Sequence, residues 1–410
     1  MIRFAHRSIS ISPSQPVPLA GKGGRSRVST CLHDDLEANI VVVGDGPRRI
    51  VVISLDSLFV GSRVTRKSLE LCADAGVPAE RVLICASHTH SAPALEDTKP
   101  LLGAYDTRHG EEIEHRLSVA LRALLRDDGQ IGTPSIGTDR TSAGMNRRLP
   151  WPVHLTRRGL RFRETVMAPN PLGPTDPQVT AVVIRGKQPA VLWHYTCHPT
   201  AFPYDKQVSA DYPGLVRAAL RKALGPTTTI AFLQGFAGDI RPPSGRAHGG
   251  ISRALNLVLR GPQFDPLTLD EWTAWGKTIA DAAVRAASNA AVAKPEIGLA
   301  EHAMVPLDRL LRGASKTRPI EMQQIQLFGL RIVAVSAEPL VGLKELVSPG
   351  SLCVGYSRDV FGYWPRTSEL PSGGYEVNEF KRVFGVDRPW CPDPDGVFKE
   401  LLDRSERLVS

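Results

Sequence analysis

Two histidines stand two residues apart in the segment Ser87–Pro93, which reads Ser-His-Thr-His-Ser-Ala-Pro. The segment follows Arg81–Ala86, an apolar run with the composition of a buried strand. In an extended chain His88 and His90 would point to the same side of the backbone, and Pro93 would end the strand and leave both at its exposed end. Neutral imidazole is the commonest ligand of a catalytic transition metal. The pair therefore indicates a metal site, and the alternative is an ordinary loop in which two histidines happen to cluster.

A metal-ligand residue followed by proline recurs after two other predicted strands. Ala190–Thr196 leads into Cys197-His198-Pro199, and Arg331–Val335 leads into Ser336-Ala337-Glu338-Pro339. Two histidines and one carboxylate, with one position left open, are a common ligand set for catalytic zinc, which makes a bound water acidic enough to ionise near neutral pH. The alternative is that each is an ordinary loop residue, because distance along the sequence does not establish closeness in space.

Two more residues could take part in chemistry at such a site. His90 would lie beside His88 and exchange protons with the bound water or the substrate. Arg147 could stabilise the oxyanion that forms on a carbonyl oxygen. A glycine-punctuated loop, Gln234–Pro242, also follows a predicted strand, and such loops let the backbone approach a ligand closely.

Within this loop Gly238, Asp239 and Arg241 are candidate substrate-binding residues. Arginine is always charged and its fork matches carboxylate or phosphate oxygens. An unpaired guanidinium is costly to bury. Arg241 would therefore pair either with Asp239 or with an anionic group of the substrate.

The elements that must position these residues predict an α/β protein. Two β-rich runs, Ala38–Val43 and Arg49–Leu55, flank the turn sequence Gly44–Pro47 and predict a hairpin. A helix over Val64–Ala75 then precedes the strand before His88, which suggests an α/β unit. Further helices are predicted over Glu111–Arg126, Leu215–Leu224 and Leu267–Ala291, and further strands over Val179–Ile184 and Thr228–Leu233. We expect one domain, residues 1–410, of mixed β-sheet layers with flanking helices and the metal site at strand ends.

Composition narrows the class of protein. The 410 residues are 42% hydrophobic and carry a formal net charge of +8. The basic residues are dispersed except in Thr138–Val166, for which we expect a solvated basic loop, or a loop that contributes one arginine to a site. This stretch lacks the interleaved aromatic residues of a stacking platform, so no nucleic-acid partner is expected.

The location is expected to be cytoplasmic. No apolar run is long enough for a membrane-spanning helix, and the N-terminus lacks the apolar core of a signal peptide. The six cysteines form no Cys-x-x-Cys pair, which fits thiols in a reducing compartment.

Several motifs, in this order, resemble those of the neutral/alkaline, non-lysosomal ceramidase family. They are Ser87–Ser91, Asn146-Arg147, Asp176–Thr180, His198–Thr200, Ser209–Gly214 and Gln234-Gly235 through Gly238-Asp239. Near the N-terminus, Ser10–Pro13 and Leu32–Leu36 are also similar to elements of that family. The similarity covers nearly the whole chain and corresponds to the catalytic domain of the family.

That family hydrolyses the amide of ceramide with one zinc ion. The resemblance implies that His88, His198 and Glu338 are zinc ligands and that Tyr363 supplies a fourth ligand. Tyr375 lies twelve residues later, before a glutamate, and would hold the developing oxyanion together with Arg147. The resemblance also matches His90 and Arg147 to the family's second histidine and its arginine.

One departure from the family bears on the substrate. The family has a serine in its Gly-Asp-x-Ser-Pro element, where this chain has Arg241. We expect a zinc-dependent hydrolase that cleaves the amide C–N bond of a ceramide-like or N-acyl amine or amino-acid substrate. The alternatives are a zinc-dependent esterase or lactonase on the same fold, and a non-catalytic binding protein that retains the fold.

Overall fold

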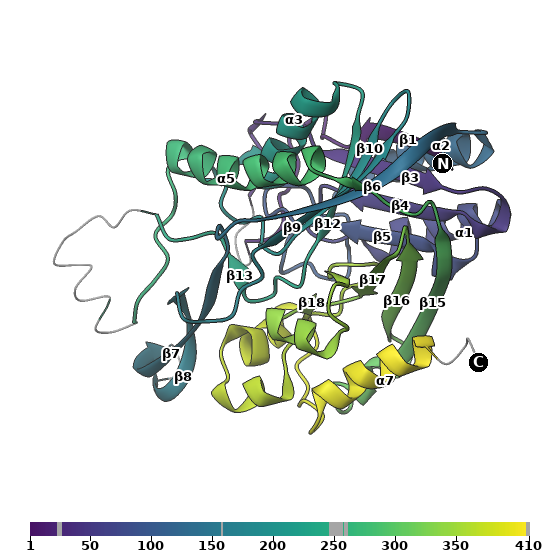
Figure 1. Ribbon diagram of the computed structural model, residues 1–410. Helices are drawn as coiled ribbons and strands as arrows, with labels where there is room; N and C mark the ends of the chain where they lie inside the picture. The colour runs from purple at the N-terminus through teal and green to yellow at the C-terminus, as the bar shows by residue number, and fades with distance from the viewer. Residues whose placement is uncertain (23–26, 157–158, 246–256, 258–260, 407–410) are drawn as a thin grey trace.

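A large curled β-sheet forms the centre of the protein (Figure 1). The computed structural model describes residues 1–22, 27–156, 159–245, 257 and 261–406. Within these residues the sheet has nine strands in the order β12-β10-β9-β6-β1-β3-β4-β5, and β14 pairs with β6. The strands are β1 (Ile2–Ser10), β3 (Glu37–Val43), β4 (Ile50–Leu55), β5 (Val82–Ala86), β6 (Gln130–Arg140), β9 (Gln178–Arg185), β10 (Ala190–Tyr195), β12 (Thr229–Gln234) and β14 (Ala291–Val292).

A smaller sheet packs against one face of the large one. Its order is β15-β16-β17-β19, with bounds β15 (Ile297–Pro306), β16 (Pro319–Leu327), β17 (Leu330–Val335) and β19 (Leu352–Val354). The side chains of alternate β3 residues point to opposite faces of the large sheet. Val41 and Val43 pack in the core shared with the small sheet, whereas Ile40 and Val42 pack in the core shared with the helices. This burial on both faces explains why the strands read as continuous apolar runs.

Helices cover the outer faces of the two sheets. The large sheet is covered by α1 (Ser62–Asp74), α2 (Thr107–Arg126), α3 (Tyr212–Leu224) and α5 (Leu269–Ser288), and the small sheet by α7 (Pro394–Glu406) (Figure 1). The predicted α/β class, with mixed sheet layers and flanking helices, is therefore confirmed. No helix in the described part of the chain is long and apolar enough to cross a membrane.

The curl of the large sheet brings its two ends together. In strand order β12 and β5 lie at opposite ends, yet β12 contacts β4 and β5. Ser54 of β4 donates a hydrogen bond from Oγ to the carbonyl oxygen of Phe232 on β12, at 2.7 Å. The loop after β5, which carries His88, and the loop after β10, which carries His198, consequently meet.

The prediction for Thr138–Val166 was wrong. Instead of a loop, most of this segment forms β7 (Met145–Thr156) and β8 (Gly159–Asn170), an antiparallel ribbon that projects from the body of the protein (Figure 1). The two-residue strand β13 (Ile240–Arg241) pairs with β7. A projecting two-stranded ribbon exposes residues on both faces, so its sequence lacks the apolar alternation that marks a half-buried strand.

Candidate metal centre

Three of the predicted ligands meet, although they lie far apart in the sequence. Glu338 Oε2 lies 3.2 Å from His88 Nε2 and 3.3 Å from His198 Nε2. All three side chains are buried. His90 lies beside them, with its Nε2 at 3.2 Å from His88 Nε2, and it is partly exposed. The ligand atoms of the three histidines all lie within 4.8 Å of one another, so the cluster could hold a metal ion.

Backbone carbonyls determine which imidazole nitrogens are free. His88 Nδ1 lies 2.8 Å from Leu58 O, and His198 Nδ1 is bonded to Ala237 O. Because a carbonyl oxygen only accepts, each Nδ1 carries the proton and each Nε2 directs a lone pair at Glu338. His198 Nε2 and Glu338 Oε2 are buried without a hydrogen-bond partner among the described residues. A cation between these acceptor atoms would satisfy them, and two imidazoles with a carboxylate suit zinc.

The charge state of the cluster also suits a metal. Burial alone would raise the pKa of Glu338, but the imidazoles of His88 and His198 hold it below its ordinary value. Burial, together with the charge of Arg147, lowers the pKa of His198 to about 4. Burial, together with the neighbouring His88, holds the pKa of His90 well below its usual range. At neutral pH Glu338 is therefore ionised, and His198 and His90 are uncharged, the forms that bind metals.

The spacing of the two histidines predicted an extended backbone at His88, but the structure does not have one there. His88 has a φ of 66°, and Tyr356, whose ring packs on the His88 ring with a centroid distance of 4.2 Å, has a φ of 56°. Such conformations cost about 1–3 kcal/mol each and persist where the surrounding structure imposes them. Here the N–H of His88 donates to Ser57 O at 2.9 Å, and the N–H of Ala86 donates to Tyr356 O at 3.1 Å.

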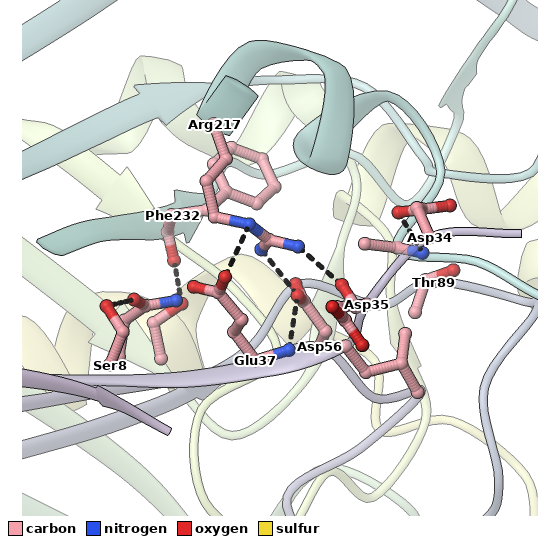
Figure 2. A network of polar contacts seen from close by, with 12 residues as sticks. Ser8, Asp34, Asp35, Glu37, Asp56, Thr89, Arg217 and Phe232 are labelled. Atoms are coloured by element: carbon pink, nitrogen blue, oxygen red, sulfur yellow. Dashed lines mark hydrogen bonds and ion pairs between the residues drawn. The ribbon is translucent and has the colours of Figure 1, made fainter. Parts of the chain in front are cut away.

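A buried ion network braces the loop between the two histidines (Figure 2). Arg217 of α3 lies with its Nη1 at 2.5 Å from Asp56 Oδ2. Asp34 accepts hydrogen bonds from the Ser209 hydroxyl and from the next backbone N–H. The carbonyl oxygen of Ser209 accepts in turn from Thr89 Oγ1 at 2.8 Å. Thr89 stands between the two histidines, so the motif that opens α3 fixes their loop.

Arg147 of β7 joins the two predicted tyrosines to the cluster. Its Nε donates to Glu376 Oε1 at 2.7 Å, and its Nη2 donates to Tyr363 Oη at 3.1 Å. Its Cζ lies 5.6 Å from the ring centroid of Tyr363 and 6.0 Å from that of Tyr375. Tyr363 is the cross-strand partner of Glu338 in the pair β18 (Glu338–Pro339) and β20 (Tyr363–Trp364). The predicted arginine and tyrosines therefore lie next to the carboxylate of the cluster.

Arg148 and Glu376 have roles at the site that were not predicted from the sequence. Arg148 Nη1 donates to Glu376 Oε2 at 2.9 Å, so two consecutive arginines share one carboxylate. Consecutive residues of a regular strand point to opposite faces, but the register of β7 shifts between Asn146 and Arg148, as in a β-bulge. Glu376 lies in a π-helical turn that starts at Tyr375. The only sequence signal was its position directly after that tyrosine.

Two of the candidate substrate-binding residues have structural contacts. Asp239 is buried; its Oδ2 accepts from Asn146 Nδ2 at 2.9 Å and its Oδ1 from the N–H of Val341 at 2.8 Å. Burial raises the pKa of Asp239 to about 6. A Cβ at Gly238 would lie 2.8 Å from Glu338 O, so the backbone can approach there only because the residue is glycine. These contacts favour structural tasks over the predicted substrate contact.

Arg241 differs from these two residues. It makes no ion pair with Asp239, which was one of its two predicted partners. Its Nε is buried and has no acceptor among the described residues, and its Cζ lies 4.1 Å from the ring centroid of Phe264.

Solved structures share this architecture. The neutral ceramidase from Pseudomonas aeruginosa matches with a TM-score of 0.73 and 15% sequence identity, over 99% of this chain and 74% of that one. This chain has the neutral ceramidase fold. A second structure, a ceramidase complexed with C2, matches with a TM-score of 0.71 and 17% identity, over 99% of this chain and 75% of that one. No family model and no curated protein sequence matches the chain. At these identities the likeness establishes the fold, as the sequence resemblance predicted.

Proposed function

We propose that this protein is a zinc-dependent amidohydrolase that cleaves the C–N bond of an N-acyl amide. The observation that carries the proposal is the buried convergence of acceptor atoms from His88, His198 and Glu338. The ceramidase fold supports an amide substrate, since the solved structures that share it are described as ceramidases. With Tyr363 as the fourth ligand, zinc would supply a Lewis acid for the carbonyl oxygen and a water that ionises near neutral pH.

Arg147 is placed to stabilise the charge that develops on the carbonyl oxygen. Burial alone would lower its pKa, but Tyr363 and Glu376 hold it above its ordinary value. These two partners also fix its Nε and Nη2, whereas Nη1 has no acceptor among the described residues. A preorganised donor of this kind costs no reorganisation during the reaction. Tyr375 is partly exposed, and burial raises its pKa, so its hydroxyl keeps its proton and offers a second donor.

His90 is the proton carrier of the proposed mechanism. It is uncharged at neutral pH, partly exposed and in contact with His88. An uncharged imidazole can take the proton of the attacking water and then give it to the leaving nitrogen. Such general acid–base catalysis contributes about 10²–10⁴-fold to the rate.

Metal analysis combined with a substrate panel tests the proposal. We expect about one zinc per chain in the purified protein, the stoichiometry of a mononuclear site. Hydrolysis of N-acyl amides should stop on chelation and return with added zinc. Faster cleavage of matched esters or lactones would instead identify an esterase or lactonase. A folded protein that holds no zinc and cleaves none of these substrates would be a binding protein on the same fold.

A further inference from the structure

Arg241 is a partly buried cation for which the described residues supply no counter-ion. In β13 it lies opposite Met145 of β7, and the residue before it lies opposite Asn146. No carboxylate of the described residues lies within ion-pair distance of its guanidinium, and its buried Nε is unpartnered. The ring of Phe264, at 4.1 Å from Cζ, is its principal neighbour. An aromatic face orients a guanidinium but does not neutralise its charge.

Arg241 also lies close to the candidate metal centre. The carbonyl oxygen of Ile240, the preceding residue, accepts the backbone N–H of His198 at 2.9 Å. Burial, together with the nearby charge of Arg147, lowers the pKa of Arg241 to about 10. Two arginines thus stand near the same site. Arg147 is neutralised by Glu376, and Arg241 has no comparable partner among the described residues.

A cation held in this way lacks the group that would offset its desolvation. Burying an unpaired charge is unfavourable, and the arginine fork is suited to bidentate contact with a carboxylate. Asp239, the acid nearest in sequence, makes no ion pair with Arg241 and instead accepts hydrogen bonds from Asn146 and Val341. A partner from outside the described residues would supply the missing negative charge.

We propose that Arg241 binds a carboxylate on the amine half of the substrate, so that the protein prefers N-acyl amino acids to neutral amides such as ceramide. The inference rests on the proposed function for the identity of the scissile bond. It assigns the anion to the amine half because the acyl half of an N-acyl lipid is a hydrocarbon chain.

The preference is measurable as binding, separately from hydrolysis. The probes are two ketone analogues with CH₂ in place of the amide NH, one built on N-octanoylglycine and one on N-octanoylglycinamide. They differ by one charge and cannot be hydrolysed. Calorimetry on the zinc-loaded protein should show the acid binding about 10- to 150-fold more tightly, the range for a charge-assisted hydrogen bond.

Three variants locate the source of the preference. Arg241→Met should bring the ratio of the two affinities close to one, and Arg241→Lys should keep part of it, because the charge remains without the fork. Arg309→Met is the matched control, since Arg309 is half exposed and pairs with Glu400; it should leave the ratio unchanged. Thermal unfolding of each variant shows that it is folded.

Three results would overturn the inference. These are equal binding of the two analogues by the unaltered protein, a ratio that survives in Arg241→Met, and kcat/KM for ceramide as high as for N-octanoylglycine. The proposed function fails separately. A protein that binds the acid through Arg241 but cleaves no amide would refute the amidohydrolase and leave the anion site standing. Amide hydrolysis without any preference for the acid would support the amidohydrolase and refute the anion site.

Discussion

Two buried polar clusters meet at the loop between His88 and His90, and they differ in how their charges are satisfied. In the Arg217 network the cation lies between two carboxylates, and Asp34 accepts hydrogen bonds from a hydroxyl and a backbone N–H (Figure 2). Arg217 lies against Asp56 at 2.5 Å and Glu37 at 3.5 Å. In the histidine cluster, by contrast, acceptor atoms face one another across 3.2 and 3.3 Å.

This difference in charge pairing distinguishes a network that stabilises the fold from a site that can bind a ligand. A buried polar network that satisfies itself fixes packing and has no remaining capacity to bind a ligand. A buried set of acceptors without donors is costly unless a cation or a donor from outside the chain completes it. The two arginines near the metal centre differ in the same way. Arg147 forms an ion pair with Glu376, whereas Arg241 forms none with any described residue.

The largest effect should come from removing one acceptor of the histidine cluster. Glu338→Gln keeps the shape of the side chain and removes its charge, and should weaken zinc binding more than about 100-fold, beyond the usual effect of outer-shell changes. Hydrolysis should then fall to background. His90→Ala is the matched comparison and should keep zinc while kcat falls about 10²–10⁴-fold. Metal analysis after dialysis, together with kinetics, measures both.

The reverse result would reassign the ligands. If His90→Ala lost the metal and Glu338→Gln kept it, three histidines rather than two histidines and a carboxylate would hold the ion. That geometry is available, because the ligand atoms of His88, His90 and His198 lie within 4.8 Å of one another.

The next largest effect should come from opening the satisfied network. Arg217→Met leaves Asp56 buried without its cation, while Glu37 keeps Arg221, and removal of one partner of a buried pair costs about 3–5 kcal/mol of unfolding free energy. Arg285→Met is the control, because Arg285 pairs with Asp139 at the surface, where such pairs contribute about 0–1 kcal/mol. Urea titration measures both changes. A loss below about 1 kcal/mol for Arg217→Met would show that the network is not the brace.

The sequence was sufficient to predict the elements that carry the acceptor cluster. His88 and His198 each follow a continuous apolar strand and precede a proline within a few residues, and these local signals predicted β5 and β10 correctly. Glu338 was found in the same way after β17. These signals are strong because a buried strand has few alternative conformations, and proline ends its pairing.

What the sequence did not predict depends on contacts between distant segments. The curl that brings β12 against β4 arises from sheet twist and packing, which no local pattern encodes. The bulge that turns Arg147 and Arg148 toward Glu376 has no composition of its own. The ribbon of β7 and β8 was taken for a loop because its apolar residues do not alternate with polar ones as in a half-buried strand. The left-handed conformation of His88 was also not predicted, because contacts with distant segments impose it.

The smallest effect should come from a substitution that displaces the His90 side chain of the histidine cluster without removing it. Gly21 has a φ of 95°, and a Cβ there would lie 2.6 Å from His90 Cγ and 2.8 Å from His90 Cα. Gly21→Ala must therefore displace the His90 ring, and a displacement of about 1 Å in a catalytic group can lower kcat/KM about 10²-fold. The zinc content should stay the same, because His90 is not among the proposed ligands.

Gly76→Ala separates displacement of His90 from backbone strain. Gly76 has a φ of 76°, and a Cβ there would have nothing within 4 Å. Both alanine variants carry the cost of a left-handed conformation, about 1–2 kcal/mol. Gly21→Ala should lose more stability in urea than Gly76→Ala, because only its Cβ collides with His90. Only Gly21→Ala should lose activity. Equal activities in the two variants would show that the exact position of His90 does not matter to the reaction. Loss of zinc in Gly21→Ala alone would make His90 a ligand and remove it from the role of proton carrier.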